Sequence, residues 1–347
     1  MKHTNIKILD CTLRDGGRLF DCNFSNKVIK EIINNLIASK IDFIELGFLR
    51  NVDIKRHDID NTFFNNMYEA EKIVDFNDST EYTLFVDYGL YDVEKLPIIE
   101  DGSKIKNLRY GFSKKDYYIN FDKIERDIET IIKKGYMVFI QPINILAYSK
   151  KELINLLKFA NKYSVRGFAI VDTYGSLYSE DLLNLSKFLD KKLNKSIILL
   201  FHSHNSYQLS FSLAILLIKT LRKRDLIIDT TLSGIGKCAG NLPTELICNY
   251  LNEKYSSNYI LKNIYNLNDD FILKYKLNFE WGYNQYSLMQ AKYQVHPNNI
   301  MYLMKKNINL VKTEQILSKL DDYSKLRYFF DTLDKLIEEV NNNDGSS

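Results

Sequence analysis

The stretch ILDCTLRDGG, residues 8–17, decides how the rest of the sequence is interpreted. In it, an apolar run with the character of a strand leads directly into an arginine, an aspartate and two glycines. Arg14 and Asp15 therefore stand where a strand passes into a loop, which is where α/β enzymes keep their catalytic residues. Gly16 and Gly17 would let the backbone turn sharply there or lie close to a ligand. Taken alone, the stretch is explained equally well by a solvated polar turn.

Short apolar, β-branched runs of the same kind recur along the first 232 residues. The later runs begin about 30 residues apart, the length of one strand–helix unit, and their near-continuous apolar character is typical of parallel strands. Amphipathic patterns with helical spacing fill the gaps, for example over 25–40 and 149–163. Eight such alternations over about 250 residues favour an α/β fold, a (β/α)8 TIM barrel, over an open doubly wound sheet. The runs begin at Ile6, Asp42, Tyr82, Asn107, Tyr136, Gly167, Ser196 and Asp225.

The pattern changes after residue 255, where no further strand repeat occurs. We therefore predict a TIM-barrel catalytic domain over 1–255 and a helical C-terminal region over 256–340. Within that region, the stretch 313–340 has the pattern of a helix. The final residues, 341–347, are polar and rich in Asn, and we expect a disordered tail there.

Composition excludes several classes of function. The chain of 347 residues carries a net charge of +3, so neither nucleic-acid binding nor a membrane-surface role gains electrostatic support. It has no signal-peptide core and no apolar run of the roughly 18 residues that a membrane span needs. Its four cysteines show neither CxxC spacing nor a disulfide framework, which indicates reduced thiols in a cytoplasmic protein.

Two histidines at the end of the seventh expected strand indicate a metal site. In LLFHSHN, His202 and His204 are two residues apart, so on a strand their side chains share one face, the barrel interior. Two inward imidazoles repel each other when charged and lack partners when neutral, and a divalent metal resolves both problems. Asp15, from the first strand, provides a third ligand. Two histidines and one carboxylate suit Mn, Zn, Fe, Co or, less well, Mg.

Two further features lie near this expected site. Glu45 is close to the end of the second strand, beside Arg14, where it forms a structural ion pair or holds the guanidinium for bidentate binding of an oxygen. The stretch SGIGKCAGNLPTEL, residues 233–246, follows the eighth strand and leads into a helix near Asn241. Backbone amides before a helix can bind a carboxylate or a phosphate.

Four motifs together resemble the metal-dependent lyase and aldolase superfamily built on a TIM barrel. This group includes 3-hydroxy-3-methylglutaryl-CoA lyase, isopropylmalate synthase and 4-hydroxy-2-oxovalerate aldolase. The motifs TLRDGG, FIELGF, HSHNSYQLSFSLA and GIGKCAGNLPTEL occur in the order of that superfamily, and the resemblance covers about residues 1–255. The 4-hydroxy-2-oxovalerate aldolase branch is the most similar.

The resemblance implies roles for individual residues. The ligands of a divalent metal would be Asp15, His202 and His204. Mn is the expected metal, with Mg, Co or Zn as alternatives. Arg14 would stabilise an enolate oxygen, with Glu45 holding it in place. The remaining implied contacts at the mouth of the barrel are Thr12, Asp172, Gly240 and Asn241, the last of which is also a candidate fourth ligand. The partners would be a small-molecule 2-oxo acid, an aldehyde and a second copy of the chain, as a dimer.

The general base departs from the superfamily pattern. The oxovalerate aldolases have a histidine three residues after the metal aspartate, and here that position is Arg18. The lyase branch uses a cysteine nine residues before the asparagine, whereas Cys238 is three residues before Asn241. We therefore expect proton transfer by Cys238, a metal-bound water or a mouth tyrosine. Arg18 is expected to bind a second anionic or polyhydroxylated part of the substrate, or else to form an ion pair with Asp21.

These observations predict a metal-dependent carbon–carbon lyase, a class II aldolase, that acts next to a pyruvate-like 2-oxo acid. Two alternatives stay open. One is an acyl-CoA condensing enzyme of the isopropylmalate synthase type, although the usual Glu-Gln after the Asp-Gly is absent here. The other is a non-catalytic scaffold or regulatory barrel, whose one support is the missing base.

Overall fold

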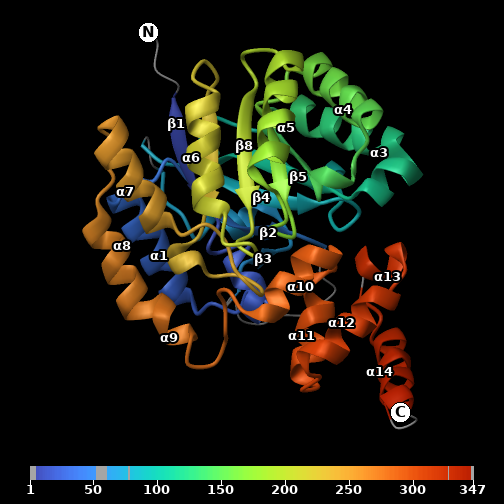
Figure 1. Ribbon diagram of the computed structural model, residues 1–347. Helices are drawn as coiled ribbons and strands as arrows, with labels where there is room; N and C mark the ends of the chain where they lie inside the picture. The colour runs from blue at the N-terminus through green and yellow to red at the C-terminus, as the bar shows by residue number, and fades with distance from the viewer. Residues whose placement is uncertain (1–4, 52–60, 77–78, 327, 345–347) are drawn as a thin grey trace.

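The computed structural model describes residues 5–51, 61–76, 79–326 and 328–344, and it contains a closed parallel barrel (Figure 1). Neighbouring strands follow chain order, and β1 pairs with both β2 and β9, with Leu9 opposite Phe43 and Ile8 opposite Ile228. The predicted TIM barrel is thereby confirmed. The barrel strands are β1 (Ile6–Asp10), β2 (Phe43–Leu49), β4 (Glu81–Asp87), β5 (Ile105–Phe112), β6 (Met137–Pro142), β7 (Gly167–Asp172), β8 (Ile198–Ser203) and β9 (Leu226–Thr230). A two-residue strand, β3 (Phe63–Phe64), pairs with the C-terminal end of β2 and was not predicted.

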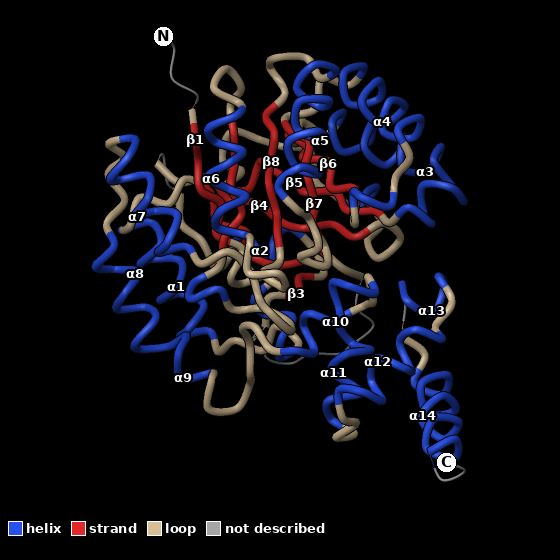
Figure 2. Tube along the Cα trace, viewed as in Figure 1, coloured by secondary structure: helices blue, strands red, loops and turns tan. Residues whose placement is uncertain are grey.

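Helices cover the outside of the barrel, as Figure 2 shows by colour. Their sequence signals are local: in α1 the stripe at 29, 32, 33 and 36 is buried, and Ser25 caps the helix by accepting the Val28 N–H. The capping box of Ser149 and Glu152 forms as expected. These helices are α1 (Asn26–Ala38), α2 (Met67–Glu71), α3 (Lys114–Lys133), α4 (Lys150–Lys162), α5 (Ser179–Lys192), α6 (Ser210–Thr220) and α7 (Thr244–Tyr255). Short 3-10 turns lie at η1 (Gly16–Phe20), η2 (Val93–Lys95), η3 (Ile145–Ala147) and η4 (Leu232–Gly234).

The inside of the barrel changes from apolar to polar along the strands. Its lower layer is an apolar cluster: Leu9, Phe43, Phe139, Ala169, Leu200 and Ile227. Since strand side chains alternate between faces, the residues two positions further along point inward as well. On several strands that next layer is polar: Glu45, Arg109, Gln141, His202 and Asp229, all buried. The fold thus builds a buried polar layer just below the open end of the barrel.

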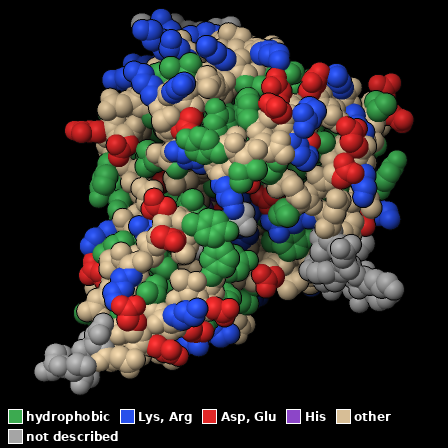
Figure 3. Space-filling view, turned by 90° about the vertical axis from the view of Figure 1, so that its right-hand side faces the viewer, with side chains coloured by type: hydrophobic (Ala, Val, Ile, Leu, Met, Phe, Trp, Pro, Cys, Tyr) green, Lys and Arg blue, Asp and Glu red, His purple; other side chains and the backbone are tan. Residues whose placement is uncertain are grey.

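The C-terminal region has two parts. Helix α8 (Leu261–Leu267), the π-helical turn η5 (Asn268–Ile272) and α9 (Leu273–Tyr275) pack on the barrel, because Ile264, Leu267 and Ile272 belong to its core. The later helices share a separate core that includes Val295, Ile300 and Leu317. They are α10 (Gln285–Tyr293), α11 (Pro297–Lys305), α12 (Leu310–Lys319), α13 (Asp322–Leu326) and α14 (Phe330–Asp344). We call this second group the C-terminal unit; it lies beside the open end of the barrel and borders a hollow (Figure 3).

Two expectations for the C-terminus were wrong. The stretch 313–340 is divided among α12, α13 and α14 rather than forming one helix. The first break falls where Leu320 adopts an extended conformation and Asp321 accepts the Ser324 N–H, which starts a new helix. Residues 341–344 belong to α14 and are not a disordered tail, while 345–347 lie outside the described residues. Among the described residues, every helix is too short or too polar to cross a membrane.

Candidate metal centre and its pocket

The three predicted metal ligands converge at the open end of the barrel. His202 is the penultimate residue of β8 and is only 5% exposed, and His204 comes directly after the strand, in an isolated bridge to Asn241. The Nε2 atoms of His202 and His204 lie 3.9 and 3.7 Å from Asp15 Oδ2. The two imidazole rings are 5.3 Å apart and nearly perpendicular, at 88°.

The loop after β1 is what places Asp15. The backbone N–H groups of Asp15 and Gly16 both donate to the Cys11 carbonyl, which turns the chain tightly. Both glycines are required by packing rather than by a ligand. A Cβ on Gly16 would lie 2.7 Å from the Ile235 side chain, and one on Gly17 would lie 2.8 Å from the Phe24 ring.

Arg14 joins Asp15 to Glu45, as the sequence suggested. Its Nε donates to Glu45 Oε2 at 2.6 Å and its Nη1 to Asp15 Oδ1 at 2.5 Å. Burial by itself would raise the pKa of Asp15, but Arg14 and the two imidazoles outweigh it and hold that pKa well below its ordinary value. Asp15 is therefore an ionised carboxylate facing two imidazoles.

Hydrogen bonds to the other ring nitrogens orient both imidazoles. His202 Nδ1 lies 3.0 Å from Asp229 Oδ2, and His204 Nδ1 lies 3.2 Å from the Gly240 carbonyl oxygen. A carboxylate and a carbonyl can only accept, so each Nδ1 carries a proton, and each Nε2 is directed toward Asp15. Burial also lowers the pKa of His204 to about 4, which keeps that ring neutral. This arrangement, with the outer nitrogen hydrogen-bonded and the inner one free, is typical of metal-binding histidines.

The donor set fits a divalent ion. One carboxylate and two imidazoles are present, and Asn241 lies beside them with its Nδ2 donating to Asp15 Oδ2 at 3.0 Å. Asn241 Oδ1 is buried and makes no hydrogen bond within the described part of the chain, so an amide oxygen is also available. Nitrogen and oxygen donors of this kind suit Mn, Co or Zn, and less well Mg.

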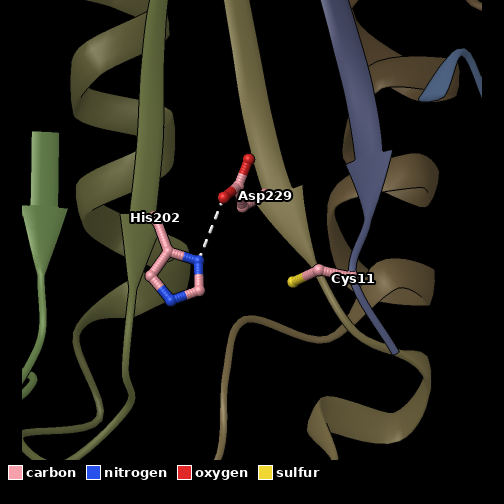
Figure 4. A group of neighbouring side chains, drawn as sticks. All are labelled: Cys11, His202 and Asp229. Atoms are coloured by element: carbon pink, nitrogen blue, oxygen red, sulfur yellow. Dashed lines mark hydrogen bonds and ion pairs between the residues drawn. The ribbon is translucent and has the colours of Figure 1, made fainter. Parts of the chain in front are cut away.

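A neighbouring trio of Cys11, His202 and Asp229 fits a metal less well, although its atoms are also close together (Figure 4). Burial raises the pKa of the Cys11 thiol well above its ordinary value, and the thiol donates to the Thr230 carbonyl at 3.2 Å. Asp229 Oδ2 already accepts from His202 and from Arg109. Metal ligation requires a thiolate, which burial of Cys11 disfavours, so the contact of this trio that the structure shows in use is the one by which Asp229 orients His202.

Arg109 connects the two sides of the centre and was not predicted from the sequence. This fully buried side chain donates through Nη1 to Glu45 Oε2 at 2.9 Å, and through Nη2 to Gln141 Oε1 at 3.1 Å and to Asp229 Oδ2. Glu45 also binds Arg14, and Asp229 also binds His202. Burial would raise the pKa of Asp229, but Arg109 outweighs it and lowers that pKa. The available signal was a charged residue at an inward position of an otherwise apolar strand.

A cavity of about 740 Å³ opens above the metal centre, between the barrel and the C-terminal unit. Arg14, Asp15, His202 and His204 line its barrel side, and His296, Pro297, Tyr323 and Leu326 line the other. Further cations in its wall are Arg18, Arg50, Lys114, Lys115 and Lys237. Arg18 lies 3.8 Å from both Asp15 Oδ1 and Asp87 Oδ2, so the expected alternative of an ion pair with Asp21 was wrong.

Three other predicted site residues point away from the cavity. Thr12 Oγ1 accepts the Leu232 N–H, and the Asp172 carboxylate accepts backbone N–H groups of its own loop, so both hold loops together. Cys238 lies in the core of the C-terminal unit, away from the cavity lining, where burial raises the pKa of its thiol to about 12. Gly240, also predicted to contact substrate, instead orients His204 through its carbonyl.

Comparison with known proteins gives consistent matches. The family model described as HMGL-like matches residues 93–271. A 4-hydroxy-2-oxovalerate aldolase from Geobacillus genomosp. 3 is 22% identical over 245 residues, which cover 70% of this chain and 69% of that protein. The N-terminal domain of a candidate aldolase from Bacteroides vulgatus superposes with a TM-score of 0.69 at 22% identity, covering 86% of this chain and 96% of that one. The carboxyl transferase domain of Rhizobium etli pyruvate carboxylase, solved with pyruvate, has a TM-score of 0.70 at 11% identity, with coverages of 99% and 62%.

Proposed function

The chain belongs to the HMGL-like family, and from that premise we propose that it is a divalent-metal-dependent carbon–carbon lyase, a class II aldolase, that forms or cleaves a bond next to a 2-oxo acid. The observation that carries the proposal is the convergence of Asp15, His202 and His204 beside Arg14 at the floor of the cavity. The 4-hydroxy-2-oxovalerate aldolase among the similar proteins supports the same kind of reaction.

In the proposed reaction the ion would be held by Asp15, His202 and His204. Mn is the expected ion, with Mg, Co or Zn as alternatives. A bound divalent ion supplies a Lewis acid that polarises the carbonyl of the 2-oxo acid. Among the described residues the Nη2 group of Arg14 has no hydrogen-bond partner, and Arg14 lines the cavity. Its N–H groups are therefore available to an enolate oxygen as negative charge develops there. Because Glu45 and Asp15 already hold the guanidinium, it need not reorganise during the reaction.

The aldehyde partner in this proposal carries an anionic or polyhydroxylated group. Arg18 and Lys237 line the cavity and both are fixed cations beyond the metal centre. The Lys237 ammonium donates to Asn298 Oδ1 at 2.7 Å, and within the described part of the chain no carboxylate forms an ion pair with it. A cavity of about 740 Å³ also leaves room for a molecule longer than acetaldehyde. We further expect the enzyme to act as a dimer.

A pyruvate-release assay tests the proposal. Purified protein with Mn(II) is given a panel of 4-hydroxy-2-oxo acids of increasing length and charge, and pyruvate is measured with a coupled dehydrogenase. Release from at least one compound, lost on chelation and in Asp15→Asn, is the expected result. Condensation of acetyl-CoA with a 2-oxo acid and no pyruvate release would instead support an acyl-CoA condensing enzyme. No metal binding at all would support a non-catalytic barrel.

A further inference from the structure

His296 is a histidine of the C-terminal unit that lines the cavity of the barrel. It is the N-cap residue of α11, and its backbone N–H donates to the Lys325 carbonyl at 2.7 Å. Neither the motifs nor the metal centre uses it. It therefore needs a separate explanation.

The hydrogen bond of the ring settles its tautomer. His296 Nδ1 accepts the Asn298 backbone N–H at 3.1 Å, so Nδ1 bears no proton and a neutral ring carries its proton on Nε2. Burial, with Lys237 and Arg18 nearby, lowers the pKa of His296 to about 3, so the ring is neutral at neutral pH. The positive end of the α11 dipole acts in the same direction. Within the described residues Nε2–H has no hydrogen-bond partner.

Contacts along one loop connect the His296 ring to the metal centre, although His296 comes from another part of the chain. Lys237 binds Asn298 next to it, and the Cys238 thiol lies 3.8 Å from the Pro297 carbonyl oxygen. The same loop continues to Gly240 and Asn241, which contact His204 and Asp15. A single loop thus connects the His296 end of α11 to the metal ligands.

We propose that His296 binds the aldehyde substrate, with its Nε2–H donating a hydrogen bond to the oxygen of the aldehyde carbonyl. We call the part of the site that binds the aldehyde the acceptor half. This proposal rests on the proposed aldolase function. In condensation, C3 of the enolate gives its electron pair to the aldehyde carbon, and the π pair of that carbonyl moves to its oxygen. His296 stabilises this alkoxide and keeps its own proton, and the product hydroxyl takes its proton from water. A neutral imidazole at a helix N-terminus is suited to this work, because it polarises a carbonyl without forming an ion pair.

The two halves of the reaction can be measured separately. Exchange of the C3 protons of pyruvate with deuterium, followed by NMR, requires only enolate formation. Cleavage of the 4-hydroxy-2-oxo acid requires the acceptor half as well. In His296→Phe and His296→Ala, we expect cleavage to fall about 100-fold, the usual effect of losing one such donor, while exchange stays at the wild-type rate. His296→Gln, whose amide N–H can reach a similar place, should keep much of the activity.

Tyr302→Phe is the matched control, because Tyr302 also lies on α11 but binds Asp334 outside the cavity. It should change neither rate. Wild-type cleavage by the alanine and phenylalanine variants would overturn the role of His296 alone. Loss of exchange as well as cleavage in all three His296 variants, with metal content retained, would mean that His296 transfers protons and would overturn the neutral-donor role. A wild-type protein that neither exchanges nor cleaves would refute the aldolase function itself, and the role of His296 with it.

Discussion

Replacing Arg109 by methionine should damage both the stability of the fold and the metal centre. The guanidinium is fully buried and bonded to two carboxylates, Glu45 and Asp229. Methionine fills much of the space but removes one cation from both carboxylates, which leaves Glu45 with Arg14 and Asp229 with His202. Breaking a buried ion pair in this way costs about 3–5 kcal/mol, so we expect the free energy of unfolding to drop by that amount and the melting temperature to fall by several degrees.

The effect on the metal follows from the route Arg109–Asp229–His202. Without Arg109 the Asp229 carboxylate loses the contact that fixes its position, so it no longer holds the His202 ring in the orientation that aims Nε2 at Asp15. Loss of such an outer contact typically lowers metal affinity by about 10–100-fold. Titration with Mn(II), followed calorimetrically at a temperature where the variant is folded, measures this directly.

Arg224 offers a matched control for Arg109. It is also fully buried, and it binds Asp190 and the backbone carbonyls of Leu193, Asn194 and Ile197 at the opposite end of the barrel. Arg224→Met should therefore lose comparable stability while binding Mn(II) normally. The reasoning is refuted if Arg109→Met binds Mn(II) like the wild type, or if the Arg224 variant loses affinity equally.

Four other outcomes are expected. Purified protein should hold about one divalent ion per chain, and elemental analysis should find it missing from Asp15→Asn and His202→Ala, since each removes a ligand. Arg14→Lys keeps the charge but loses the planar fork, so it should bind metal normally and lose most turnover; near-normal kcat would contradict this. Arg18→Ala should raise KM for a long anionic substrate far more than for a short one, and equal effects would argue against an anion contact. Cys238→Ala should leave kcat unchanged, because the thiol faces the second core; a large loss of kcat with normal metal content would show that the thiol acts in the reaction.

Much of the barrel was predictable because its strands are apolar on both faces, which makes each run visible without knowledge of its neighbours. The strand β3 escaped prediction because two residues, Phe63 and Phe64, form no pattern. The division of 313–340 into three helices was missed for a related reason. Its apolar spacing continues across Asp321, whereas in the structure α12 ends at an extended Leu320 and Asp321 accepts the Ser324 N–H at the start of α13.

In the site, residues on strands were placed better than residues in loops. His202 and His204 share a face through the two-residue period of a strand, so their convergence could be expected. Thr12 and Cys238 lie in loops beyond strand ends, where no period sets the side-chain direction, and Asp172 is the last residue of β7, where its carboxylate turns to the N–H groups of the loop that follows. Arg109 and Asp229 were missed because they are far apart in sequence, and only closure of the barrel makes them partners.

The cavity is bounded on one side by the barrel and on the other by a unit with its own core. The two walls can therefore change independently over evolutionary time. Substitutions on α11 and α13 would alter which acceptor fits, while the metal ligands and Arg14 stayed as they are. The loop through Cys238 limits this freedom, because it is packed into the C-terminal unit and also carries Asn241. If the C-terminal unit were replaced by the helices of another protein, those helices would have to pack around Cys238 in the same way to preserve the metal centre.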